Sequence, residues 1–510
     1  MINSRTIFMG ILLAIMVIGL SGCIVSTSPG TEKVIVMNPG DTKVFKVSGV
    51  NLNTSITKCE WLIDRKDGSY SEFLRTDQIE FTVNPEGEKS NRVRITCVYS
   101  RWTIISITAW VTDKRTWNIC IPRNTAPVWQ GDYYITDSTD VQMLNGYTEI
   151  TGALNISNSN LKRLEGLENL TNIGGDLRIY DNAVLTSLSG LQNITSVGGD
   201  LSIGRNAALT NLAGLENLTS FGGYLDINRN AALTSLSGLE KITSVGGGLY
   251  IGSNAALTSL SGLNNLTSVG GYLWIEGNPA LTNLSGLENL TSVGGDLKIG
   301  DSYYGVNKAL TSLSGLNNLT SVGGYLRIED NPALTSLYGL ENLTSVGKDL
   351  DIWTNKALKS LSGLENLTSV CGDLGISEND ALTNLSGLEN LTSVGGLVII
   401  WFNAALTSLS GLQNLTSVGW VLWIYYNPAL TSLSGLENIT SVDGDLKIEG
   451  NAALTSLGMT GLQRVGGYFS IYYNPMLCTF LAEELMNQVL AGGGIGGTRT
   501  ISDNKTCTMP

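Results

Sequence analysis

The main side chains of this chain that could do chemistry are carboxylates, lysines, tyrosines and cysteines, because none of its 510 residues is a histidine. That absence excludes a Ser–His–Asp or Cys–His catalytic arrangement and every metal site with a histidine ligand. A lyase acting on polysaccharides would need carboxylates grouped with lysine or arginine on one face, whereas the outward Lys298, Arg327 and Lys447 are scattered along the chain. We therefore expect neither an enzyme nor a cofactor.

Aspartates recur at a strand-edge position and raise the question of a calcium site. They are Asp176, Asp200, Asp296, Asp349, Asp373 and Asp445. Tyrosine or glycine replaces them in other turns, and the glycine–aspartate nonapeptide spacing of a calcium-binding repeat is lacking. We expect these aspartates to be solvated and no metal to bind.

Aromatic side chains are better candidates for binding a ligand, because they are concentrated at positions expected to face outward. The candidates are Tyr272, Trp274, Tyr325, Trp353, Trp401, Phe402, Trp420, Trp423, Tyr425 and Tyr426. Trp401 and Tyr425 hold the same position in adjacent turns, so they should lie about 4.8 Å apart. Exposed aromatic clusters mark protein or carbohydrate contacts, but Trp and Tyr also stabilise sheets by cross-strand stacking. We favour binding for the cluster at 401–426 and stacking for scattered members such as Tyr250.

A repeat that begins near residue 150 positions these side chains. An isoleucine recurs every 24 residues, with one interval of 29 and two of 23, at positions 156, 179, 203, 227, 251, 275, 299, 328, 352, 376, 400, 424, 448 and 471. In Leu297-Lys-Ile299 the apolar residues should point inward and the lysine outward, as strand alternation requires. The longest interval contains a five-residue insertion around 302–306, which should project as a loop beside the same sheet.

Asparagine and glycine hold fixed places in each turn. The asparagines are Asn182, Asn206, Asn230, Asn254, Asn278, Asn307, Asn331, Asn355, Asn379, Asn403, Asn427, Asn451 and Asn474. Buried amides there can satisfy backbone groups of the bend, and identical neighbours would form a ladder. A Gly-Gly pair before most strands is expected to allow positive φ at a tight corner. These features predict a long parallel β-solenoid with leucine walls.

The formal charge of −13 is spread unevenly. Residues 31–121 hold 13 basic and 11 acidic groups, whereas residues 122–510 hold 17 basic and 33 acidic groups. An acidic solenoid repels phosphate backbones, so we expect no nucleic-acid partner.

Residues 1–23 have the features of an export signal: one cation at Arg5, an apolar run from Ile7 to Leu20, and small residues before a cysteine. The segment Leu20-Ser-Gly-Cys23 resembles the lipobox of prokaryotic lipoproteins. The resemblance implies that Cys23 becomes the N-terminus and carries a lipid, with 24–31 as a tether. The alternative is an ordinary signal peptide with an incidental cysteine. We expect an exported protein of the cell envelope or surface, in an oxidising compartment.

Residues 32–121 show short alternating strand patterns that predict an antiparallel β-sandwich. Cys59, Cys97 and the intervening Trp61 resemble the cysteine–tryptophan core of immunoglobulin-like modules, and the pattern would also fit polycystic-kidney-disease-type repeats. We predict a Cys59–Cys97 bridge between the two sheets, although Cys120 could compete for either partner.

The repeat resembles leucine-rich repeats and, more closely, the receptor L-domain, a right-handed β-helix with similar turns. The segment 147–156 resembles the first turn of that family, and the segment from 474 to 507 resembles its disulfide-closed cap. The resemblance implies a linker at 122–131, a solenoid at 132–477 and a cap at 478–510. It also implies a Cys478–Cys507 bridge that holds the amphipathic stretch 480–490 over the open end of the core.

Two further features have structural interpretations. Asn-Leu-Thr and Asn-Ile-Thr match the N-glycosylation pattern at many sites, such as Asn169, Asn289 and Asn414, but the repeat itself accounts for them. Cys371 replaces a glycine of a Gly-Gly pair, and we expect an unpaired, partly buried thiol.

We expect a lipid-anchored surface protein whose solenoid binds an extracellular protein or glycan. The alternative is a structural component of the cell envelope with no specific ligand.

Overall fold

The computed structural model describes seven strands between residues 35 and 120 by their backbone, and residues 128–507 apart from 302 and 304. The predicted signal segment, the predicted lipidation site Cys23 and the predicted tether lie outside the described residues. The predicted sandwich is described only through its strands.

These seven strands form two sheets. They are β1 (Ile35–Met37), β2 (Ile56–Asp64), β3 (Tyr70–Ser71), β4 (Gln78–Thr82), β5 (Asn91–Tyr99), β6 (Thr103–Val111) and β7 (Thr116–Cys120). One sheet has the order β1-β6-β5-β2-β3 and the other pairs β4 with β7. Cys59 lies opposite Cys97 on the neighbouring strands β2 and β5 of one sheet, rather than on two facing sheets as expected. Their side chains lie outside the described residues, so the bridge stays a prediction.

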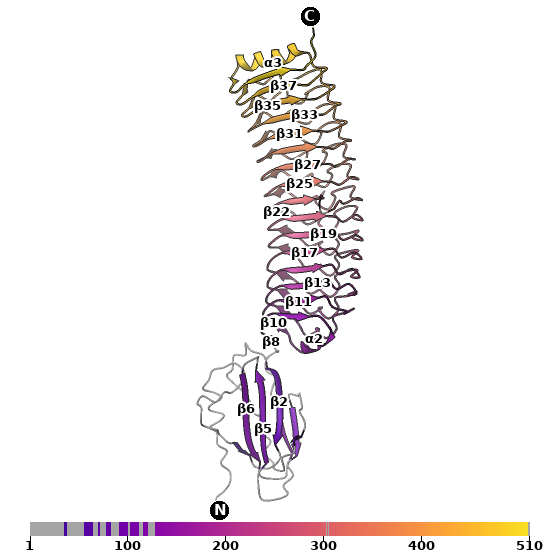
Figure 1. Cartoon of the computed structure of the whole chain (residues 1–510), viewed down its shortest axis with the longest axis vertical. Helices are drawn as coiled ribbons and strands as arrows, with labels where there is room; N and C mark the ends of the chain where they lie inside the picture. Colours follow the sequence, from indigo (N-terminus) through magenta and orange to yellow (C-terminus); the bar gives the residue numbers. More distant parts are fainter. Residues whose placement is uncertain are drawn as a thin grey trace, which may run out of the picture. The chain divides into compact units, whose positions relative to one another are not determined.

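A sheet of 16 parallel strands runs the length of the solenoid (Figure 1). Its strands are β9 (Tyr133–Ile135), β11 (Leu154–Ser157), β13 (Leu177–Tyr180), β15 (Leu201–Gly204), β17 (Leu225–Asn228), β19 (Leu249–Gly252), β21 (Leu273–Glu276), β23 (Leu297–Ile299), β25 (Leu326–Glu329), β27 (Leu350–Trp353), β29 (Leu374–Ser377), β31 (Val398–Trp401), β33 (Leu422–Tyr425), β35 (Leu446–Glu449), β37 (Phe469–Tyr472) and β39 (Arg499–Ser502). The predicted isoleucines pair in register from Ile156↔Ile179 to Ile448↔Ile471. The prediction of a parallel solenoid with turns of about 24 residues is confirmed.

A second, shorter strand lies in the turn before most long-sheet strands. These strands are β8 (Val128–Trp129), β10 (Glu149–Ile150), β12 (Asn172–Ile173), β14 (Ser196–Val197), β16 (Ser220–Phe221), β18 (Ser244–Val245), β20 (Ser268–Val269), β22 (Ser292–Val293), β24 (Ser321–Val322), β26 (Ser345–Val346), β28 (Ser369–Val370), β30 (Ser393–Val394), β32 (Ser417–Val418), β34 (Ser441–Val442), β36 (Arg464–Val465) and β38 (Gly494–Ile495). The valine of each Ser-Val pair is buried and the serine is more exposed, as strand alternation requires. The core therefore lies between two rows of strands and is closed by leucines.

The asparagine ladder is present. The backbone N–H of Asn206 donates to Oδ1 of Asn230, and its Nδ2 donates to the carbonyl of Ile179. The same pattern recurs through Asn474, and all of these side chains are fully buried. Because each amide donates to a backbone carbonyl of the preceding turn, the ladder helps to fix the spacing of the turns.

The role predicted for the Gly-Gly pairs is wrong. The glycines with positive φ are those of the Ser-Gly-Leu corner, such as Gly238 (φ +119) and Gly262 (φ +111), together with several glycines outside the Gly-Gly pairs. A Cβ on Gly222 of a Gly-Gly pair would instead collide with the carbonyl of Gly198 in the preceding turn. These pairs are required for the close approach of backbones.

The corner glycine also explains much of the acidity of the solenoid. The N–H of Gly286 donates to the carboxylate of Glu288, and the N–H of Gly339 donates to Glu341. Gln192 and Asn264 serve the same purpose in other turns. These carboxylates satisfy a backbone donor, so their charge follows from the fold.

A helix and a disulfide close the C-terminal end. Helix α3 (Thr479–Ala491) buries Ala482, Leu485 and Val489. The other described helix, α2 (Ser138–Met143), lies near the start of the solenoid, directly after β9. Cys478 and Cys507 form a disulfide with their Cα atoms 5.5 Å apart.

Gln488 on α3 donates to the carbonyls of three residues in the last turn, Met459, Thr460 and Leu462. This contact was not anticipated from the sequence. In the described part of the chain Cys371 is unpaired, as expected, but it is exposed rather than partly buried.

Candidate binding surface

The cluster at 401–426 is built on strands β31 and β33. Trp401 is the register partner of Tyr425, and their rings lie parallel with centroids 5.4 Å apart. Trp423 stacks on Tyr425 at 4.3 Å. All three side chains are half-buried, so the sheet-face part of the cluster is largely satisfied by its own ring contacts.

Phe402 and Tyr426 directly follow these strands and differ from Trp401, Trp423 and Tyr425 in exposure and in backbone conformation. Their rings are parallel and 5.3 Å apart, yet their side chains are 45% and 42% exposed. Their backbones are left-handed, with φ of +52° and +51°. A bulky side chain is uncommon in that region, where glycine is favoured.

The structure does not bring the other candidates into this cluster. Trp420 lies on the corner before β33 and is 60% exposed, with no ring contact to another described aromatic residue. Tyr272 and Trp274 form a separate pair at 4.4 Å, which Tyr224 and Tyr250 extend.

Tyr325 and Trp353 have different neighbours again. Tyr325 lies under the cationic groups of Arg327 and Lys348, each 4.8 Å from its ring centroid. Among the described residues Trp353 has no hydrogen-bond acceptor for its buried indole N–H.

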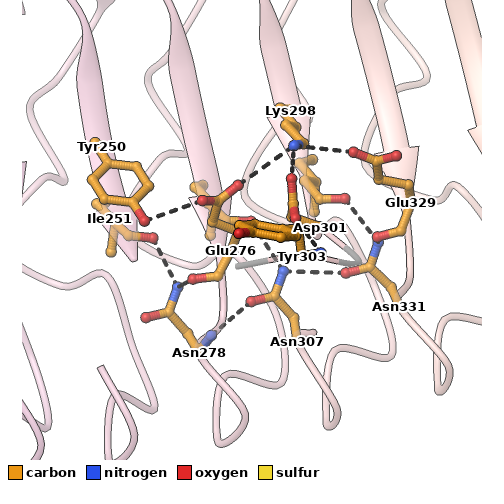
Figure 2. Close-up of polar contacts among 12 residues, drawn as sticks. Tyr250, Ile251, Glu276, Asn278, Lys298, Asp301, Tyr303, Asn307, Glu329 and Asn331 are labelled. Atoms are coloured by element: carbon orange, nitrogen blue, oxygen red, sulfur yellow. Dashed lines mark hydrogen bonds and ion pairs between the residues drawn. The ribbon is translucent and has the colours of Figure 1, made fainter. Parts of the chain in front are cut away.

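A polar cluster around Lys298 was missed by the sequence analysis (Figure 2). The ammonium of Lys298 lies 3.7 Å from Glu276 and 3.1 Å from Glu329, and it also bonds to Asp301. The hydroxyl of Tyr250 donates to Glu276 at 3.1 Å. Contrary to our expectation, Lys298 therefore lies among carboxylates on its face of the sheet. Two features of the sequence could have indicated this cluster. Glu276, Lys298 and Glu329 hold outward positions in neighbouring turns, and Asp301 directly precedes the insertion.

Burial sets the proton affinities in this cluster. It raises the pKa of Glu276, an effect that the nearby Lys298 and Tyr250 oppose. Burial works against the ammonium of Lys298, but its three carboxylate neighbours raise its pKa overall. The cluster holds one cation and three carboxylates that bond mainly to one another, so it is best described as an internal network beneath the insertion.

Asp351 forms a second buried ionic contact on the next turns. Nε of Arg327 donates to its carboxylate at 3.1 Å. Burial nevertheless raises the pKa of Asp351 to about 6, because the guanidinium offsets only part of the desolvation.

An open groove of about 590 Å³ lies beside the aromatic cluster. It is lined by Lys356, Glu378, Asp380, Phe402, Ala404, Tyr426, Pro428 and Gly450. These residues directly precede or directly follow members of the asparagine ladder, so the groove runs across five consecutive turns. It combines ring surface with two carboxylates and one ammonium.

The strand-edge aspartates have a structural role rather than simple solvation. Oδ1 of Asp349 accepts the N–H of Asp373, and Oδ1 of Asp373 accepts the N–H of Leu397. Within residues 128–507, apart from 302 and 304, no group of three acidic or cysteine side chains could hold a metal ion.

The asparagines of the Asn-Leu-Thr segments form a second, exposed ladder. Nδ2 of Asn289 donates to the carbonyl of Asn264 and Nδ2 of Asn414 to that of Glu389, both at 2.7 Å. The threonine hydroxyl of the same segment donates to the corresponding threonine carbonyl one turn earlier, as Thr416 does to Thr392. The repeat therefore accounts for this pattern, as the sequence analysis predicted.

No protein-family model matches the chain, and no curated protein is significantly similar to it. Among the described residues, no helix has the length and apolar character needed to cross a membrane.

Proposed function

We propose that this protein is an exported lipoprotein, anchored through Cys23, whose leucine-rich solenoid binds an extracellular protein or glycan. The observation that carries the proposal is the aromatic cluster of Trp401, Phe402, Trp423 and Tyr425 with its neighbour Tyr426, which stands on a scaffold of nearly constant turns. Core packing does not require these outward side chains, and exposed aromatic groups are typical of contact surfaces.

The finer parts of the proposal rest on resemblance. We place the solenoid among receptor L-domain-like proteins and the strands before it in an immunoglobulin-like spacer. The export signal supports the location, and the acidity of the solenoid argues against nucleic acid as a partner. We propose no catalysis, because the groups around Lys298 are engaged with one another beneath the insertion.

A structural envelope component is the second candidate. Its support is the near-identity of the turns, whose ladders would suit a protein selected for rigidity alone. Assembly of the purified protein into sheets or fibres, seen by electron microscopy, would favour it.

The test is binding of the chain without residues 1–22, carrying Cys23→Ser, to arrays of glycans and of host-cell surface extracts. A triple variant with Trp401, Trp423 and Tyr425 changed to Ala is compared with Tyr338→Ala, which removes an exposed ring outside the cluster. Binding lost only in the triple variant, with an unchanged melting temperature, supports the recognition function. No binding by the wild type would move the structural function ahead.

A further inference from the structure

We infer that the ligand is a neutral glycan chain that lies in the groove beside the asparagine ladder, with Phe402 and Tyr426 as its ring platform. The inference rests on the proposed recognition function and names the class of ligand. It moves the main contact from the half-buried sheet face to the edge of the sheet.

Contacts within the fold account for the two rings only in part: Phe402 lies 4.9 Å from the ring of Trp401 and the hydroxyl of Tyr426 donates to Glu449, yet both residues stay about half exposed. Neither residue lies within a strand, so the preference of strands for aromatic residues does not account for them. Both adopt positive φ, as this position does in most turns, where polar residues such as Arg205 and Thr354 or a glycine such as Gly450 usually fill it. Two stacked rings left about half exposed at a position that most other turns fill with a polar residue or glycine indicate a use outside the fold.

Polar groups of the right kind lie beside the rings. The carboxylate of Glu378 has no hydrogen-bond or ion-pair partner within the described part of the chain, so it can accept from a ligand hydroxyl. Asp380 and Lys356 form an ion pair of 3.2 Å whose side chains are half-exposed. A sugar presents C–H groups on one face and hydroxyl groups around its edge, and this combination of ring surface and charged acceptors fits both.

The shape favours a chain over a single sugar. The groove crosses five turns, which at the usual strand spacing span about 19 Å. It is open along its length and shallow, and it lacks the deep apolar pocket that usually holds the central side chain of a protein partner.

The charge favours a neutral chain. The single lining cation, Lys356, is already paired with Asp380, and Glu378 adds a further negative charge. A glycan rich in uronic acid or sulfate would meet repulsion here and in the acidic solenoid around it.

The experiment uses an array that carries neutral and acidic glycans, followed by calorimetry with the neutral oligosaccharide that binds best. The protein is the chain without residues 1–22 and with Cys23→Ser. The test variant is Phe402→Ala with Tyr426→Ala, and the matched control is Tyr338→Ala, which removes a ring of similar exposure. We expect the double variant to lose about ten- to hundredfold in affinity, because each aromatic contact contributes up to roughly one factor of ten, while the control keeps wild-type affinity.

Each other outcome overturns the inference. Binding only of acidic glycans or only of proteins would contradict the ligand class and leave the recognition function standing. Neutral-glycan binding that survives in the double variant but is lost on changing Trp401, Trp423 and Tyr425 would return the site to the sheet face. If nothing binds while circular dichroism shows a folded solenoid, the inference and the proposed function both fail.

Discussion

The backbone N–H of Asn379 donates a 3.1 Å hydrogen bond to Oδ1 of Asn403 in the next turn. Asn403 in turn donates from Nδ2 to the carbonyls of Ile376 and Trp401. One buried side chain thus satisfies backbone groups in two turns, and the solenoid depends on this relationship along its length.

Asn403→Leu should therefore be strongly destabilising. The leucine is similar in size but leaves the N–H of Asn379 buried without a partner and removes one hydrogen bond from the carbonyl of Ile376, at a cost of about 3 kcal/mol in unfolding free energy. Asn414→Leu, in the exposed ladder, should cost less than about 1 kcal/mol, because water can replace its hydrogen bond. Urea denaturation followed by circular dichroism checks both values, and equal losses would contradict the role given to the inner ladder.

Asp351→Asn should stabilise the protein at neutral pH. The folded-state pKa of about 6 lies above the ordinary aspartate value of 3.8, so the folded protein holds this proton more tightly and loses stability as pH rises from about 4 to 6. The asparagine can still accept from Arg327 and carries no charge to desolvate, so the gain at pH 7 should approach about 3 kcal/mol and shrink towards pH 4.

Asp445→Asn is the control with the opposite sign. Burial opposes its charge, but the N–H of Tyr468 and the ammonium of Lys447 lower its pKa overall. Its replacement should reduce stability at neutral pH, with the difference disappearing in acid. Urea midpoints between pH 3 and 8 measure both variants, and parallel pH profiles would refute the assignment.

Cys478→Ser with Cys507→Ser should loosen the C-terminal cap. The bridge closes a segment with a sequence separation of 29, for which chain entropy predicts about 3.6 kcal/mol. Limited proteolysis should cut first near α3 in this variant. Cys371→Ser should leave the cleavage pattern unchanged, because that thiol is exposed and makes no bridge in the described chain.

Gly238→Ala should be among the most damaging single changes in the solenoid. Its φ of +119° is unfavourable for alanine, and the new Cβ would collide with the carbonyl of Leu212. Gly131 also has positive φ, of +83°, but faces open space, so Gly131→Ala should cost only about 1–2 kcal/mol. Melting temperatures of the two variants give the comparison.

The regular part of the fold could be predicted because each turn solves the same packing problem with the same residue types. The isoleucine row and the asparagine row are both visible as periods, and their roles follow from alternation and hydrogen bonding. The row of repeating isoleucines nevertheless did not predict the strands around Ile135 and Ile501. The segment that joins each of them to the nearest isoleucine of the row does not keep the repeat.

The site was predictable only in part. Trp401 and Tyr425 could be paired from their period, but the left-handed backbone after each strand, which Phe402 and Tyr426 share with most turns, has no signature in residues that usually avoid it. The network around Lys298 depends on how the insertion folds back, which periodicity cannot give. The Gly-Gly pairs were misread because conformational freedom and close approach both select glycine.

The interchangeable turns have a consequence for how such a gene can change. Neighbouring turns bond to one another through the same asparagine and threonine positions, and many also through an aspartate, so loss or duplication of 24 residues would rejoin closely similar surfaces. Recombination between near-identical coding segments could therefore lengthen or shorten the molecule by whole turns. Such an event before residue 356 would move the aromatic groove relative to the first turn of the solenoid while leaving its own contacts intact.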